Sequence, residues 1–299
     1  MIHNKKKILF IGTVEFSYRA LSVLIENKFE IIGILTKKES NFNSDYYDLT
    51  PFAIVNNIPI IYRTNDNKDE ILSFIKFLNP DIIYCFGWSH ILPKSILSIP
   101  KHGVIGFHPA ELPNNRGRHP IIWALFLGLE QTASTFFIMD EGADTGDIIS
   151  QEKIEIIDDN ALSLYNKIIN VALKQIVSFT LELETKEVFL NKITQDKAEG
   201  NSWRKRTKND GKIDFRMTSK AILNLVNALS KPYVGAHLEF QEMDVKIWKV
   251  VEEDFNKLNH EPGKILEIYG NHLIVKTYDG AIRIIDHGFN HLPLKGQYL

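Results

Sequence analysis

KKKILFIGTVEFSYRALSVLIENKFEIIGILT, residues 5–36, decides the fold class of this chain. The segment opens with a short apolar run that is closed by Gly12, and a second apolar run occupies residues 30–36. Apolar residues between the two runs recur at helical spacing, which predicts a strand, a helix and a strand. Because open α/β sheets bind ligands at the carboxyl ends of their strands, Gly12 and Thr13 are expected at a binding site.

The alternation of strand-like and helix-like segments continues to about residue 195. A long helix is expected at 161–184, because a polar helix start at 158–160 precedes apolar residues at periods of three and four. The pattern GxGxxG is absent, so a dinucleotide site is not indicated. We expect a doubly wound, mostly parallel, Rossmann-like α/β domain over residues 1–195. Its further strands are expected at 60–62, 80–87, 102–109 and 133–140, and its further helices at 67–77 and 121–129.

The sequence changes character after residue 195 and indicates a second domain over residues 196–299. A polar stretch comes first, followed by a helix-like segment at 219–229. Short alternating runs punctuated by glycine then follow, for example DVKIWKVVE at 244–252 and HLIVKTYDG at 272–280. Such runs are typical of an antiparallel sheet or a small barrel. We expect a smaller, β-rich, OB-like domain.

The composition limits the compartment and the partners of the chain. Lysine plus arginine number 35 and aspartate plus glutamate 37, so a net charge of -2 provides no overall positive field for a polyanion. The apolar stretch near the N-terminus, residues 8–11, is too short for a signal segment or a membrane span. Cys85 is the only cysteine, and its apolar neighbours indicate a buried, inert thiol. We expect a cytoplasmic, soluble protein with no membrane partner and no stable nucleic-acid partner.

Two polar motifs contain the residues that we expect to perform chemistry. GFHPAELPNNRGRHP at 106–120 holds His108 at a strand end, and MDEGADTGD at 139–147 holds Asp144 in a glycine-containing loop. Asp144 follows His108 by 36 positions, which leaves room for one helix and one strand and is expected to bring both loops to the same sheet edge. A nearby carboxylate fixes the tautomer of an imidazole and raises its basicity, so the pair predicts an enzyme. The alternative is that His108 only packs and Asp144 only closes a turn.

The same motifs resemble a known family. GFHPAELPNNRGRHPIIWAL and MDEGADTGDII are similar to the histidine and aspartate motifs of the 10-formyltetrahydrofolate-dependent formyltransferases, and the spacing of 36 residues agrees with that family. KILFIGTVEFSYRAL resembles the opening strand and helix of methionyl-tRNA formyltransferase and the sugar N-formyltransferases. CFGWSHILPKSIL resembles the folate-contacting loop, and WRKRTKNDGKIDF the C-terminal domain. The resemblance covers nearly the whole chain.

The resemblance implies transfer of a formyl group from 10-formyltetrahydrofolate to a primary amine. It makes His108 the general base or proton shuttle for the amine, and Asp144 the residue that orients and polarises the amine. It places Gly12 and Thr13 against the amine substrate. Arg116 either binds an anionic group of the substrate, for which a guanidinium is well shaped, or fixes its own loop. The residues that it assigns to the pterin, mainly through backbone groups, are Trp88, His90, Ile91, Leu92, Asp140, Glu141 and Gly142.

Position 106 departs from the family pattern, which usually reads Asn-x-His. The family's Asn side chain donates a hydrogen bond to the oxyanion that develops on the formyl carbonyl, and this chain has Gly106 there. Loss of one such donor typically lowers the rate by about 10²–10³-fold. Three outcomes stay open: another donor such as Asn114, Asn115 or a backbone N–H replaces it, protonated His108 covers the role, or the chain binds folate with little transfer. We expect a working transferase with a rearranged oxyanion site.

The segment KKESNFNSDYYDLTP at 37–51 bears on the identity of the amine. It is mixed in charge, contains Phe42, Tyr46 and Tyr47, and resembles sugar formyltransferases more than the basic tRNA-facing loop of the methionyl-tRNA enzymes. A nucleotide-linked sugar needs a few phosphate contacts and aromatic stacking, whereas a tRNA demands basic surface. We therefore expect a nucleotide-linked amino sugar of surface polysaccharide biosynthesis as the substrate, unless these aromatic residues only pack the loop.

Other readings stay open at this point. The basic run WRKRTK at 203–208 either grips phosphates or is solvated surface. His287 and His291 lack a third ligand in the sequence, so no metal is expected. The alternative functions are a methionyl-tRNA formyltransferase, a folate-binding or regulatory protein, and a hydrolase of the formyl donor. The subunit number stays open, with a homodimer as one option.

Overall fold

The computed structural model describes residues 5–39, 45–189, 191–255 and 259–299. The described chain forms two compact units. The first comprises the described parts of Met1–Gly117, Ala133–Ile154 and Lys167–Ser202, and the second comprises Arg118–Thr132, Glu155–Asn166 and the described parts of Trp203–Leu299. The last segment of the second unit begins at Trp203, seven residues after the start expected for the second domain at residue 196.

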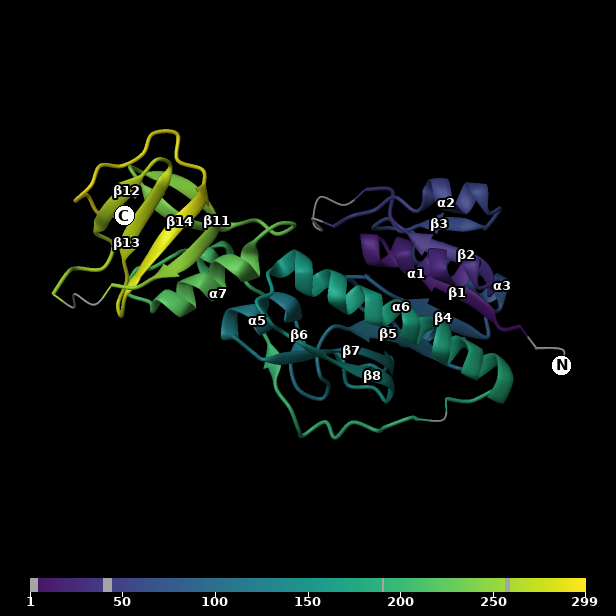
Figure 1. The fold of residues 1–299 in the computed structure, drawn as a ribbon. Coiled ribbons are helices and arrows are strands. Elements are labelled where there is room, and N and C mark those ends of the chain that lie inside the picture. The colour runs from purple at the N-terminus through teal and green to yellow at the C-terminus, as the bar shows by residue number, and fades with distance from the viewer. Residues whose placement is uncertain (1–4, 40–44, 190, 256–258) are drawn as a thin grey trace. The chain divides into compact units, whose positions relative to one another are not determined.

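A seven-stranded sheet of order β3-β2-β1-β4-β5-β7-β8 forms the centre of the first unit (Figure 1). The strands from β3 to β5 pair in parallel, whereas β7 runs antiparallel to β5. The strand order reverses beside β1, so the carboxyl ends of β1 and β4 flank the switch point where such sheets bind ligands. The strands are β1 Lys7–Ile11, β2 Glu30–Thr36, β3 Ile60–Tyr62, β4 Ile82–Cys85, β5 Val104–His108, β7 Gln131–Ile138 and β8 Ile148–Glu155.

Helices cover this sheet and bury the apolar positions that the sequence predicts. The helix α1, Glu15–Glu26, buries Phe16, Ala20, Leu21 and Leu24, the residues at helical spacing. The long helix α6, Ala161–Lys186, lies across the strands in Figure 1. Its Phe179 ring packs against aromatic rings of β4 and β7. The remaining helices are α2 Thr50–Val55, α3 Lys68–Leu78 and α4 Lys94–Leu97.

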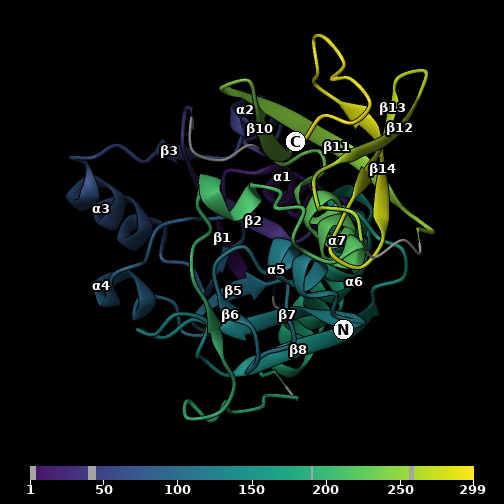
Figure 2. The same ribbon diagram turned by 90° about the vertical axis from the view of Figure 1, so that its left-hand side faces the viewer.

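The second unit combines two helices with a five-stranded antiparallel sheet of order β10-β11-β14-β13-β12 (Figure 2). The helix α5, Pro120–Leu127, packs against α7, Ser219–Leu229. It therefore belongs to this unit although its sequence lies in the range expected for the first domain. The strands are β10 Ala236–Phe240, β11 Met243–Glu253, β12 Ile265–Tyr269, β13 His272–Lys276 and β14 Ala281–His287. Three short elements complete the described chain: β6 Arg116–Gly117 in the first unit, β9 Ser202–Trp203 at the boundary between the units, and η1 Lys208–Gly211 in the second unit.

The expected class, a Rossmann-like α/β sheet with a smaller β-rich domain, is confirmed. Cys85 lies inside the first unit, where burial raises the pKa of its thiol to about 12. The thiol therefore stays protonated and inert at neutral pH, as expected. Among the described residues, no helix combines the length and the apolar composition that crossing a bilayer requires.

Candidate active site

The turn between β1 and α1 is fixed by one buried serine. The Oγ atom of Ser17 accepts hydrogen bonds from the backbone N–H groups of Thr13 at 3.0 Å and Val14 at 3.1 Å. The same hydroxyl donates to the carbonyl of Phe86 at 2.6 Å, which ties the turn to the end of β4. A Cβ atom at Gly12 would lie 2.5 Å from that carbonyl oxygen, so only glycine fits. Gly12 and Thr13 thus form a rigid turn at the switch point, as the sequence predicts.

His108 is the last residue of β5, and only 4% of its surface is exposed. The loop that follows it is anchored by side chains of β7 and β8. Thr135, the partner of His108 across β7, donates to the carbonyl of Ala110 at 2.6 Å. The side-chain amide of Gln151 donates to Thr135 Oγ1 at 3.0 Å and to the carbonyl of Leu112 at 2.9 Å. These contacts fix the direction in which the chain leaves the imidazole.

The two ring nitrogens of His108 have different partners. Nε2 lies 2.7 Å from the carbonyl oxygen of Asn115, and a carbonyl only accepts, so Nε2 carries a proton in this arrangement. Nδ1 lies 3.6 Å from Oδ2 of Asp144, which is beyond hydrogen-bond distance but within range of strong charge interaction. Nδ1 therefore faces a carboxylate oxygen.

Asp144 reaches His108 by a different path from the one that the spacing suggests. Because β7 is antiparallel to β5, its last residue Ile138 pairs with Ile105 and not with His108. The loop 139–147 has to fold back along the sheet. Asp144 adopts a left-handed backbone with φ of 59°, and a Cβ atom at Gly146 would lie 1.7 Å from the carbonyl oxygen of Ile138. The two motifs meet as expected, but the expectation that they follow strands ending at one sheet edge is wrong.

The Asp144 carboxylate is held by the loop that carries Asn115. The backbone N–H of Gly117 donates to Asp144 Oδ2 at 3.0 Å, so the oxygen that faces His108 is also bound by the neighbouring loop. The side chain of Asp144 is 22% exposed, which leaves it in reach of a bound substrate. A buried imidazole, a partly exposed carboxylate and a fixed carbonyl therefore meet in one place, a suitable arrangement for moving a proton.

The guanidinium of Arg116 is bound by residues 195–199 of the same unit. Arg116 is 7% exposed, and its guanidinium donates to the carbonyls of Glu199 at 3.0 Å and Asp196 at 3.2 Å and to Gln195 Oε1 at 3.0 Å. Its donors on Nη1 and Nη2 are thus directed at protein oxygens. Of the two roles left open by the sequence, this geometry favours fixing the loop over binding an anionic substrate group.

The segment 88–92, which is expected to hold the pterin, contains one buried side-chain donor that lacks a hydrogen-bond partner among the described residues. The Nε1 atom of Trp88 is buried and has no hydrogen-bond partner among the described residues. His90 packs against the Trp88 ring, and burial, followed by the positive charge of Lys37, lowers the pKa of His90. Ile91 is 88% exposed, whereas Leu92 is buried in the core. Leu92 can contact a ligand only through its backbone, and the free indole N–H fits a polar heterocycle.

The second predicted pterin segment is a self-closed turn. Asp140 Oδ1 accepts from the backbone N–H of Gly142 at 3.0 Å and from Thr145 Oγ1 at 2.6 Å, and Oδ2 pairs with Lys197 at 2.8 Å. Burial tends to raise the pKa of Asp140, but these hydrogen bonds outweigh it and lower the pKa. Glu141 is exposed. The carboxylate of Asp140 therefore shapes the turn.

Gly106 has no room for the side chain that the family pattern places there. It pairs with Phe137 across β5 and β7. A Cβ atom at this position would lie 2.8 Å from Phe137 Cζ and 2.9 Å from Met139 Cγ. Phe137 is only 3% exposed, so the ring occupies the space into which an Asn side chain would begin. The departure from Asn-x-His is therefore built into the packing of the sheet.

The aromatic residues of the segment 37–51 pack within the first unit. The hydroxyl of Tyr46 lies 3.2 Å from the carbonyl of Lys37, to which it donates. The ring of Tyr47 stacks on Tyr18 at a centroid distance of 4.4 Å, and Tyr47 is 39% exposed. Phe42 lies outside the described residues. The two tyrosines thus agree with the alternative that these aromatic residues pack the loop, although Tyr47 is partly exposed.

The basic run 203–208 folds onto its own unit. Arg204 forms an ion pair with Asp210, and Arg206, which is 8% exposed, donates to the backbone carbonyl of Asp210. Both guanidinium groups lie over the ring of Trp123. Trp123 is half-buried beneath these arginines, so it does not lie wholly in the core as the sequence suggests. The two arginines are used in packing η1 against α5.

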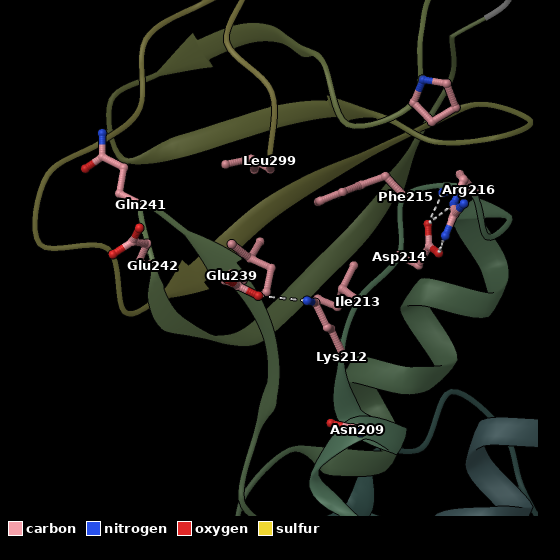
Figure 3. Close-up of a pocket in the computed structure, with 12 residues that line it drawn as sticks. Asn209, Lys212, Ile213, Asp214, Phe215, Arg216, Glu239, Gln241, Glu242 and Leu299 are labelled. Carbon is pink, nitrogen blue, oxygen red and sulfur yellow. Dashed lines mark hydrogen bonds and ion pairs between the residues drawn. The ribbon is translucent and has the colours of Figure 1, made fainter.

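A cavity of about 770 Å³ in the second unit contains none of the predicted site residues (Figure 3). Four of its charged side chains pair with one another: Lys212 contacts Glu239 at 2.9 Å, and Arg216 pairs with Asp214 (Figure 3), which leaves Glu242 as the remaining charged side chain of the lining. These pairs leave little charge to recognise a ligand. The described residues that meet around His108 are the better candidate site.

Sequence reasoning missed several residues that shape this site. Asn115 was considered as an oxyanion donor, but the structure turns its carbonyl oxygen toward His108. Thr135 and Gln151 are polar residues on buried strands, which is the one signal that marks them. Gln195 and Asn201 lie in a stretch whose polarity indicates only a domain boundary. Their partners are far away in the sequence, so no local pattern could have identified them.

Comparison with known proteins gives consistent matches over both units. Residues 6–180 match the family described as Formyl transferase, and residues 205–291 match Formyl transferase, C-terminal domain. The chain is 32% identical over 284 residues to the methionyl-tRNA formyltransferase of Clostridioides difficile, a match that covers 93% of this chain and 90% of the relative.

Two solved structures share the fold over nearly their whole length. One is WlaRD, a sugar 3N-formyl transferase solved in the presence of dTDP and 5-N-formyl-THF, with a TM-score of 0.70, 21% identity and coverage of 97% of this chain and 100% of that chain. The other is an N-formyltransferase from Helicobacter canadensis in complex with folinic acid and dTDP-3-aminofucose, with a TM-score of 0.70, 20% identity and coverage of 93% and 98%.

Proposed function

This chain belongs to the formyl transferase family, and we propose that it transfers a formyl group from 10-formyltetrahydrofolate to the amine of a nucleotide-linked amino sugar. The observation that carries the proposal is the approach of His108 Nδ1 to Asp144 Oδ2 at 3.6 Å. The pair and the Gly12–Thr13 turn, which is expected to face the amine, all lie within the residues that match the family. The same proposal includes that the formylated sugar is used to build a surface polysaccharide.

The proposed reaction moves one formyl group and one proton. The amine nitrogen attacks the formyl carbon, the bond from that carbon to N10 of the folate breaks, and N10 leaves with a proton. His108 Nδ1 accepts the proton that the amine loses and returns it to N10. Asp144 stabilises the imidazolium in between, because an opposite charge favours the protonated ring. Since Gly106 offers no side-chain donor, the protonated ring also supplies the charge that stabilises the oxyanion.

The donor site rests on the segment 88–92 and the turn at 140–142. The buried Trp88 N–H without a partner and the exposed backbone of the Asp140 turn are suited to a flat heterocycle with many hydrogen-bonding groups. The two structural neighbours were solved with formyl derivatives of tetrahydrofolate, which supports the same donor for this chain.

The choice of an amino sugar rests on charge. A net charge of -2 and arginines committed to intramolecular partners favour a small acceptor over a tRNA, whose phosphates need extensive basic surface. The Helicobacter canadensis neighbour was solved with dTDP-3-aminofucose, which is an acceptor of the proposed kind. The same two features make a stable nucleic-acid partner unexpected.

A second candidate function is formylation of methionyl-tRNA. It is favoured by the 32% identity to the methionyl-tRNA formyltransferase of Clostridioides difficile over 93% of this chain. In that case the run WRKRTK at 203–208 would contact phosphates, through the exposed faces of residues whose other faces pack on η1 and α5.

An acceptor screen tests the proposal. The purified protein is incubated with 10-formyltetrahydrofolate and a panel of dTDP- and UDP-linked 3-amino and 4-amino sugars, and the product is identified by its mass. Initiator methionyl-tRNA is the matched competitor, assayed at low and high salt because counterion release makes tRNA binding steeply salt-dependent. We expect one amino sugar to gain a formyl group at both salt concentrations. Formylation of methionyl-tRNA alone, with a steep loss at high salt, would contradict the assignment.

A further inference from the structure

The segment 195–201 contacts both loops of the candidate site from the same unit. It comes after α6 in the sequence, and its residues pair with the loop 113–117 and with the loop 139–147. At its far end, the carbonyl of Asn201 accepts from the backbone N–H of Arg116 at 3.0 Å, and Asn201 Oδ1 accepts from the N–H of Asn115 at 2.8 Å. Asn201 therefore fixes the peptide group between Asn115 and Arg116, whose carbonyl oxygen accepts the hydrogen bond from His108.

The near end of the segment holds the Asp144 loop through one side chain. Gln195 is 6% exposed. Its Nε2 atom donates to the carbonyl oxygens of Asp144 at 3.1 Å and Gly146 at 2.6 Å, and its Oε1 atom accepts from Arg116 at 3.0 Å. One primary amide thus joins the aspartate loop to the loop that carries Asn115. Only the primary amide of Gln or Asn offers two donors and an acceptor in an uncharged side chain, and that of Gln reaches one methylene further.

The backbone of the Asp144 loop needs such support. Asp144 itself is in the left-handed region, which costs energy for residues other than glycine even though Asp and Asn tolerate it best. Gln195 Nε2 is the hydrogen-bond donor to the carbonyls of Asp144 and Gly146, and a buried carbonyl that loses its donor, as that of Gly146 would, is unfavourable. Gln195 therefore stabilises the one conformation that brings Asp144 to His108.

We propose that Gln195 is a positioning residue for formyl transfer, which fixes the separation of His108 and Asp144 by tying the two site loops together through Arg116. The inference rests on the proposed roles of His108 and Asp144. A displacement of about 1 Å at a reacting group can lower a rate by about 10²-fold, so loss of this tie should appear in the chemical step. Because the Gln195 side chain is buried and its amide bonds to protein groups, substrate binding should change little when the amide is removed.

Two substitutions separate the functions of the amide. Gln195→Met removes both the donors and the acceptor. Gln195→Glu keeps an oxygen for Arg116 but removes the donors to Asp144 and Gly146. The matched control is Gln175→Met: Gln175 is 5% exposed and donates to the carbonyl of Ser134 at 3.1 Å and to Ser150 Oγ at 2.8 Å, neither of which belongs to the site loops.

Steady-state kinetics with the accepted amine give the first readout. We expect kcat to fall about 10- to 100-fold in both Gln195 variants while KM for 10-formyltetrahydrofolate stays within about twofold. The Gln175→Met variant should keep kcat within about threefold at a similar loss of stability. Wild-type kcat in Gln195→Glu, or an equal fall of kcat in Gln175→Met, would overturn the positioning role.

Hydrogen exchange gives a second readout that needs no substrate. Peptides that cover residues 139–147 should exchange faster in Gln195→Met than in the wild type and should be unchanged in Gln175→Met. Unchanged exchange in Gln195→Met would overturn the inference even if transfer were lost. A wild-type protein that transfers to no amine would instead refute the proposed function, and the exchange experiment would still decide whether Gln195 holds the loop.

Discussion

The individual residues of the site were predicted unevenly from the sequence. His108 and Asp144 could be found because an imidazole at a strand end and an acid in a glycine-containing loop are local patterns, and the structure brings them within 3.6 Å. The role of Arg116 could not be found in this way. Its partners at residues 195–199 are about 80 positions away, and only the folded chain shows that they occupy its guanidinium.

The charge of Asp144 can be removed without disturbing its backbone. Asn has the same shape, tolerates φ of 59° and still accepts from Gly117, so Asp144→Asn should fold normally. We expect its kcat to fall by about 10²–10⁴-fold, the usual contribution of proton transfer by a positioned group, and His108→Ala to fall at least as far. The control is Asp158→Asn, an exposed residue with φ of 49°. Steady-state rates and thermal melts of the three variants check this, and near-normal turnover in Asp144→Asn would refute its role.

At the scale of elements, long periodic patterns were sufficient to locate helices and strands in the sequence, whereas short or ambiguous patterns were not. The strand at 30–36 and the helix at 219–229 occur where the sequence places them. The helices α2 and α4, of six and four residues, are too short for periodicity to reveal them. The antiparallel direction of β7 could not be predicted either, because a fully buried strand has the same continuous apolar sequence whether it pairs in parallel or antiparallel.

The pairing of β5 with β7 makes a prediction about Gly106. Because Phe137 and Met139 occupy the space beside its Cα, Gly106→Asn should destabilise the protein by about 1–3 kcal/mol through overpacking. Combining it with Phe137→Leu, which shortens the opposing side chain, should recover part of that loss. A double-mutant cycle in urea should give a favourable coupling energy of about 0.5–2 kcal/mol.

The result that would contradict this packing account is additivity. If the free energies of unfolding for Gly106→Asn and Phe137→Leu simply add in the double variant, the ring does not exclude the Asn side chain. Gly106→Ala is the graded control, because it adds a Cβ atom without a longer side chain and should cost less than Asn.

At the scale of the whole molecule, the sequence was informative about class and charge. The alternation of strands and helices indicated a Rossmann-like sheet, and the glycine-punctuated runs indicated a β-rich second domain, both of which the structure has. The assignment of α5 to the second unit could not be predicted, since it depends on packing against α7, about a hundred residues later. The formyl transferase matches extend over both units, so the transfer chemistry is a property of the family to which the whole chain belongs.

Release of tetrahydrofolate from 10-formyltetrahydrofolate, measured with and without the amine, tests the central claim most directly. If His108 and Asp144 deprotonate a bound amine that attacks the formyl carbon, release should require the amino sugar and match the formylated product mole for mole. Release at the same rate without any amine would identify hydrolysis instead of transfer. Binding of the folate with no release under either condition would show that the pair, with Gly106 in place of the family's Asn, performs no transfer.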